Sequence, residues 1–82
     1  LKLAYEAGSA GGTYAAALNA ANEIAVAAFL QEEIGFLDIQ YLLEKTMDQH
    51  VSTTNITLDT ILHVDERTRI ETEKNIQHLL RK

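Results

Sequence analysis

The chain has 82 residues, of which 46% are hydrophobic, so it can form one small domain with an apolar core and is not expected to be disordered. Because it contains no cysteine, a disulfide scaffold, a thiolate metal site and a cysteine nucleophile are excluded. The net charge of −5 argues against nucleic-acid binding. The longest strongly apolar run, residues 20–30, is too short and too polar to span a membrane.

The first predicted element is a short helix over residues 1–7, because Leu1, Ala4 and Tyr5 recur at helical spacing. The glycine-rich stretch 8–12 follows, and we interpret it as a hinge between two helices. A phosphate-binding loop would need a preceding strand and a following Lys-Ser or Lys-Thr pair, and the sequence predicts neither. The chain begins with leucine rather than methionine, so we expect a fragment or a processed product.

The second predicted helix covers residues 14–31, with Thr13 as its N-cap, and is rich in alanine, the strongest helix former. Apolar residues occupy most of its circumference, so we expect it to be the central helix of the fold. Its polar interior residues, Asn19, Asn22 and Glu23, form one narrow stripe. The stripe is either a solvent-facing edge or a polar contact with another element or domain.

The third predicted helix begins after Gly35, which interrupts the apolar pattern. Asp38 is its expected N-cap, and the helix is expected to end near His50. Residues 51–55 are rich in Ser, Thr and Asn and are predicted to form a loop.

The last third of the chain allows two interpretations. Either Thr57 caps a short helix and Asp65 caps a separate final helix, or one helix covers residues 58–80. In a single helix, Arg69 and Thr72 would lie in the middle of a broad apolar face, and Arg69 would need a polar partner. That face would contain Leu58, Ile61, Leu62, Ile76, Leu79 and Leu80. We favour the first interpretation, with a bend near Val64 and Asp65.

Together these elements predict an all-α fold, a small helical bundle of three longer helices plus shorter helical pieces, in a single domain over residues 1–82. His50, His63 and His78 lack the spacing of a helical metal site and are predicted to be surface or loop residues. No catalytic, cofactor-binding or metal-binding residue can be proposed, since chemistry needs convergent groups. The candidate residues for an inter-domain or internal polar contact are Asn19, Asn22, Glu23 and Arg69.

Two stretches carry a family resemblance: Leu-Asn-Ala-Ala-Asn-Glu-Ile-Ala-Val at residues 18–26 and Ile-Gly-Phe-Leu-Asp-Ile at residues 34–39. They closely resemble the C-terminal domain of 1-deoxy-D-xylulose 5-phosphate reductoisomerase. Residues 1–4, the loop at 11–13 and the closing stretch 58–69 are similar as well, so the resemblance covers essentially the whole chain. Many family members carry a proline shortly after the Gly-Gly segment, where this chain has two alanines.

The resemblance implies an enzyme that converts 1-deoxy-D-xylulose 5-phosphate to 2-C-methyl-D-erythritol 4-phosphate in the non-mevalonate route to isoprenoids. Family members use NADPH and Mg or Mn, and they are homodimers with a dinucleotide-binding domain, a catalytic domain and a C-terminal helical bundle. This chain resembles only the bundle. We therefore expect it to bind no cofactor, to be inactive alone and to support the catalytic domain. The implied location is the bacterial cytoplasm, or the plastid of a plant or alga.

An alternative interpretation is a free-standing helical module that binds a partner protein, and a third is a small enzyme in its own right. The family resemblance disfavours the former, and the absence of a convergent site disfavours the latter. An isolated bundle would expose the surface that faces the catalytic domain, so we expect it to self-associate, for instance by exchanging its first helix about the hinge at 8–12. We also expect that Asn22→Ala lowers the stability or activity of the full enzyme.

Overall fold

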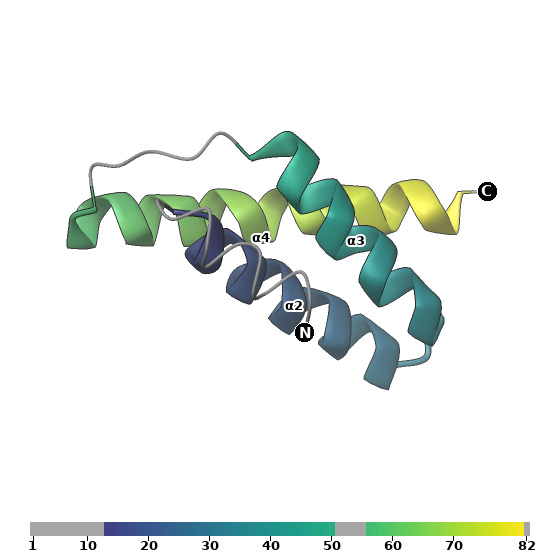
Figure 1. Ribbon diagram of the computed structural model, residues 1–82. Helices are drawn as coiled ribbons and strands as arrows, with labels where there is room; N and C mark the ends of the chain where they lie inside the picture. The colour runs from purple at the N-terminus through teal and green to yellow at the C-terminus, as the bar shows by residue number, and fades with distance from the viewer. Residues whose placement is uncertain (1–12, 51–55, 82) are drawn as a thin grey trace.

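The protein is all-α, as predicted. The computed structural model describes residues 13–50 and 56–81, and within these ranges it contains helices and no strand (Figure 1). The helices, in chain order, are α2 (Tyr14–Leu30), α3 (Phe36–Gln49) and α4 (Leu58–Leu80). They correspond to the three longer helices of the predicted bundle. None of the described helices is long and apolar enough to cross a membrane.

Some predicted elements lie outside the described residues. These are the short helix at 1–7, the hinge at 8–12 and the loop at 51–55.

The alanine-rich helix α2 is the centre of the bundle, as expected. It packs extensively against both α3 and α4, whereas α3 and α4 make far fewer contacts with each other. Its buried positions are mostly alanines, and these small side chains let two helices approach the same segment closely. The buried residues of α2 are Ala17, Leu18, Ala20, Ala21, Ala25 and Ala28.

The large apolar side chains gather at one end of the bundle. Ile34, Leu42 and Ile76 form a buried cluster with Ala25 and Ala28, and Leu42 is fully buried. This end contains the C-terminal part of α2, the turn after it and the C-terminal part of α4. Burial of such aliphatic side chains is the main stabilising contribution in a domain of this size.

The turn between α2 and α3 is a Schellman motif without glycine. The Glu33 N–H donates to the carbonyl of Ala28, and the Glu32 N–H donates to that of Phe29, both at 2.9 Å. Glu32 has a φ of 62°, in the left-handed region that this motif usually fills with glycine. The motif ends α2 and is followed by the buried Ile34.

Helix α3 begins at Phe36, earlier than predicted. Gly35 is the N-cap residue, and its N–H donates to the Asp38 carboxylate at 2.8 Å. The prediction that Asp38 is the N-cap is therefore wrong. Asp38 is the third residue of the helix, where a carboxylate satisfies a free backbone N–H and interacts favourably with the helix dipole.

Helix α4 is one continuous helix of 23 residues, so the predicted bend near Val64 and Asp65 is wrong. Thr57 caps it as predicted, since its hydroxyl accepts the Thr60 N–H at 3.1 Å. Asp65 lies inside the helix and caps nothing. The helix needs no bend because the polar residues on its apolar face have partners: the buried Thr72 hydroxyl donates to the Thr68 carbonyl at 2.7 Å, and Arg69 forms two ion pairs.

Candidate functional site

The charged side chains of α2 and α4 meet in one cluster, which we call the α2–α4 charge cluster and which contains Asn19, Glu23, Asp65 and Arg69. The Arg69 guanidinium donates to the carboxylates of Glu23 and Asp65, each at 2.8 Å. The Asn19 amide donates to the same Glu23 oxygen at 3.4 Å. Three of the four residues predicted as a polar contact therefore lie together. Arg69 joins α4 to α2 through Glu23, 46 positions earlier in the sequence.

The electrostatics of this cluster hold Arg69 in its charged form. Its hydrogen bonds to Asp65 and then to Glu23 raise the pKa of Arg69 above its ordinary value. Two carboxylates face one guanidinium, so the cluster carries a net negative charge. Its members are partly or fully exposed, so solvent screens the attraction, and the cluster orients α4 on α2 more than it stabilises the fold.

Asn22, the fourth predicted residue, is separate from this cluster. It is exposed and makes no hydrogen bond within the described part of the chain. Asn19 and Glu23 are exposed as well, so the polar stripe of α2 forms a solvent-facing edge in this chain. Within the stripe, Glu23 makes an internal polar contact by binding Arg69, and Asn22 does not.

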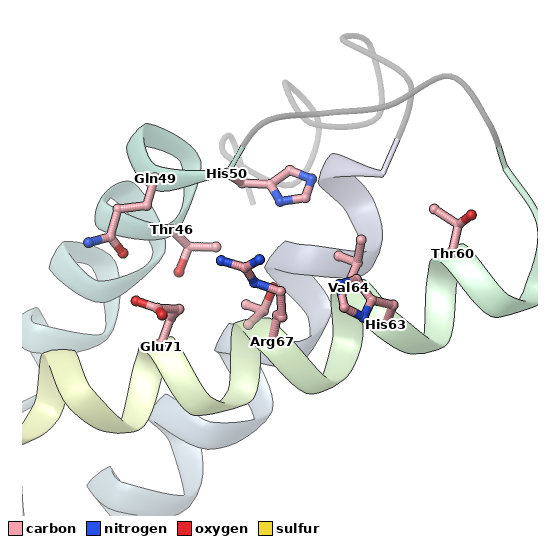
Figure 2. A pocket seen from close by; sticks show the side chains of 9 residues that line it. Thr46, Gln49, His50, Thr60, His63, Val64, Arg67 and Glu71 are labelled. Atoms are coloured by element: carbon pink, nitrogen blue, oxygen red, sulfur yellow. The ribbon is translucent and has the colours of Figure 1, made fainter.

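A hollow of about 470 Å³ lies between the C-terminal end of α3 and the N-terminal half of α4 (Figure 2). Helices α3 and α4 make far fewer contacts with each other than each makes with α2. His50, Thr60, His63, Arg67 and Glu71 line it, together with Thr46, Gln49, Val64 and Thr68. Figure 2 shows side chains of α3 and α4 facing each other across this space.

His50 ends α3 and connects it to the start of α2. Its Nε2 lies 2.7 Å from the Thr13 hydroxyl, and its ring packs edge-on against Tyr14 with 5.3 Å between ring centroids. Burial lowers the pKa of His50 below its usual range. By position His50 fits the prediction of a surface or loop histidine, since it follows the last residue of α3, but tertiary packing half-buries its side chain.

Sequence reasoning missed this contact because its partners are 37 positions apart. Thr13 was predicted to cap α2 with its side chain. It is the N-cap residue by position but makes no side-chain cap hydrogen bond, and its hydroxyl is directed to His50 instead.

The chemistry available on these helices is limited. Among residues 13–50 and 56–81, no group of three or more His, Asp or Glu side chains could hold a metal ion. The hollow combines one arginine, one glutamate and two histidines, without a nucleophile placed against a base. We therefore assign no metal-dependent, cofactor-dependent or nucleophilic step to the described residues.

Comparison with known proteins shows the family to which the chain belongs. Residues 1–71 match the family described as the DXP reductoisomerase C-terminal domain. The chain belongs to this family. It is 56% identical to the 1-deoxy-D-xylulose 5-phosphate reductoisomerase of Listeria innocua and 58% identical to that of Chlorobium chlorochromatii, each over 69 residues. Each match covers 84% of this chain and 18% of the relative.

A solved protein structure has a fold similar to that of this chain. The chain is similar to the reductoisomerase of Zymomonas mobilis in complex with NADPH, with a TM-score of 0.86 and 45% sequence identity. This match covers 93% of the chain and 20% of that structure. The chain thus spans about a fifth of the length of the relatives it matches.

Proposed function

We propose that this chain is the C-terminal helical domain of a 1-deoxy-D-xylulose 5-phosphate reductoisomerase, and that it supports the catalytic domain without activity of its own. The whole enzyme would form 2-C-methyl-D-erythritol 4-phosphate, with NADPH as reductant and Mg or Mn as metal, in the non-mevalonate route to isoprenoids. The single observation that carries the proposal is the match of nearly the whole chain to one fifth of an NADPH-bound reductoisomerase.

Two features of the bundle fit this role. The α2–α4 charge cluster orients the longest helix on the central one. The polar edge of α2, which includes the unpaired Asn22, offers hydrogen-bonding groups to a neighbouring domain. The parent enzyme would be a homodimer, located in the bacterial cytoplasm or in a plastid.

The test of this proposal is an activity assay by NADPH consumption with 1-deoxy-D-xylulose 5-phosphate and Mg. Three samples are compared: this chain alone, the reductoisomerase lacking its C-terminal domain, and a mixture of the two. We expect no turnover from the chain, little from the shortened enzyme and restored turnover from the mixture.

The matched control adds this chain to the intact enzyme, where it should change nothing. If the shortened enzyme is as active as the intact enzyme, the bundle is dispensable for chemistry and the proposed supporting role is wrong. If the chain alone oxidises NADPH with this substrate, the proposal of an inactive domain is wrong.

A further inference from the structure

The two ends of the bundle differ in how well they are filled. At one end, Ile34, Leu42 and Ile76 pack into a buried cluster. At the other end, where α2 begins and α3 ends, the bundle holds the hollow of about 470 Å³ described above. The hollow is an open depression, so among the described residues this end is less completely filled than the other.

The N-terminal turns of α4 present uncovered aliphatic side chains at this second end. We call residues 58–62 the α4 overhang, and in Figure 1 these turns extend past the start of α2. Leu58 is 72% exposed and Leu62 is 57% exposed, and Ile61 between them is also exposed. On the helix they continue the apolar face that α2 and α3 cover further along, at Ile76.

The first described helix, α2, also begins at this end (Figure 1). The family is by description a C-terminal domain, so the rest of such an enzyme precedes it in sequence. The matches cover 18% of the relatives, which leaves about four fifths of their length outside this chain. Thr13, the first described residue, binds His50 on the wall of the hollow that α4 also lines.

We propose that the α4 overhang is the surface of the bundle that docks against the preceding domain of the same polypeptide, with Leu58, Ile61 and Leu62 as its apolar anchors. This inference rests on the proposed function and specifies its partner and its contact surface. Interfaces between domains of one chain bury roughly 600–1,500 Å² and contain such apolar centres. A single uncovered helix turn with three aliphatic side chains suits that role.

The chain offers a matched control at its opposite end. Leu30 and Leu37 are 73% and 79% exposed beside the α2–α3 turn, so they equal the overhang leucines in type and exposure. The two double variants to compare are Leu58→Gln with Leu62→Gln, and Leu30→Gln with Leu37→Gln. Glutamine keeps the helix propensity and removes only the apolar surface.

At a concentration where the isolated chain sediments as a monomer, we expect both double variants to leave its unfolding midpoint unchanged, because all four side chains are exposed there. In the full-length reductoisomerase, the overhang variant should lower the unfolding midpoint and the turnover, and the control should alter neither. Equal effects of the two variants on the full-length enzyme would overturn the proposal. So would a fall in the stability of the isolated chain confined to the overhang variant, because residues of this chain would then cover the face.

Hydroxyl-radical footprinting measures the docking directly. Labelling of Leu58, Ile61 and Leu62 is compared between the isolated chain, at a concentration where it sediments as a monomer, and the full-length enzyme. We expect labelling to fall about fivefold or more in the enzyme, as for side chains buried in an interface core. Labelling of Leu30 and Leu37 should stay the same.

Undiminished labelling of the overhang in the full-length enzyme would overturn the proposal. Protection that disappears when the enzyme is diluted to single subunits would assign the face to the second subunit, which also overturns it. The footprint does not depend on whether the bundle is needed for turnover. The docking surface and the proposed supporting function can therefore fail separately.

Discussion

Arg69 links α4 to α2 by an ion pair. It binds Glu23 on α2 and Asp65 one turn earlier on its own helix, each at 2.8 Å. We predict that Arg69→Gln and Glu23→Gln each lower the stability of the chain modestly. Combined, they should lower it by less than the sum, because both remove the same contact. Chemical denaturation of the four proteins of this double-mutant cycle measures the coupling.

A suitable control for the Arg69 cycle is Lys74→Gln. Lys74 lies 3.9 Å from Glu71 on the same helix and is mostly exposed, so its removal should scarcely change stability. Strictly additive effects of Arg69→Gln and Glu23→Gln would show that the pair does not couple the two helices.

His50 should make the stability of the bundle depend on pH. Burial lowers its pKa in the folded state, so between that lowered value and the unfolded value of about 6.5 the unfolded chain binds more protons. Stability therefore rises with pH in this window and is lost as the pH falls from 7 through 6.5. The titratable groups that line the same hollow are His63, Arg67 and Glu71.

The measurement for His50 is the unfolding free energy at several pH values between 7 and 5, and His50→Gln should flatten its fall on acidification. The control is His78→Gln, because His78 is exposed at the other end of α4. An unchanged pH dependence in the His50 variant would contradict this prediction.

Local sequence patterns predict the contacts of these residues within one helix, but not their contacts between helices. The ion pair between Arg69 and Asp65 follows from their i, i+4 spacing on one helix. The Arg69–Glu23 and Thr13–His50 contacts join residues 46 and 37 positions apart. Only the packing of α2 against its neighbours brings these partners together, so local patterns carry no information on them.

At the scale of the helices, the periodic segments predicted α2 and α3 with ends accurate to a few residues, whereas α4 was predicted as two helices separated by a bend. The bend was inferred because Arg69 and Thr72 lie on an apolar face. Thr72 satisfies its hydroxyl within the helix by donating to the Thr68 carbonyl, and Arg69 reaches Glu23. A polar residue on an apolar face therefore breaks a helix only when no partner is within reach.

The α2–α3 turn carries strain that a single substitution can relieve. Glu32 has a φ of 62°, and a left-handed conformation costs an L-residue roughly 1–2 kcal/mol. We predict that Glu32→Gly stabilises the chain by up to about 1 kcal/mol, since the greater freedom of glycine in the unfolded state offsets part of the gain. Thermal and chemical unfolding of the variant measure this change.

The control for the turn is Glu33→Gly, next to Glu32 in the same Schellman motif. The positive φ belongs to Glu32, so glycine at Glu33 should bring no gain and only the entropic cost. A loss of stability in the Glu32 variant as large as in the Glu33 variant would show that the turn is not strained.

At the scale of the whole molecule, the bundle is filled at one end and open at the other. The all-α architecture and the central position of α2 could be predicted, because an alanine-rich helix that is apolar on most sides is buried among its neighbours. The uneven filling could not, because it depends on how α3 and α4 lie relative to each other, and they make far fewer contacts with each other than with α2. The hollow beside His50 and the exposed α4 overhang lie at the open end.

The open end leads to a prediction for the isolated chain in solution. Leu58, Ile61 and Leu62 expose apolar surface that a second copy can cover, so we expect the chain to self-associate as its concentration rises. Sedimentation velocity over a wide concentration range should show a rising average mass, and the double variant Leu58→Gln with Leu62→Gln should reduce it. Replacing Leu30 and Leu37 with Gln should reduce the average mass less, if copies of the chain associate through the overhang. A monomer mass that is constant with concentration would show that the exposed leucines are tolerated in water, and the expectation of self-association would then be wrong.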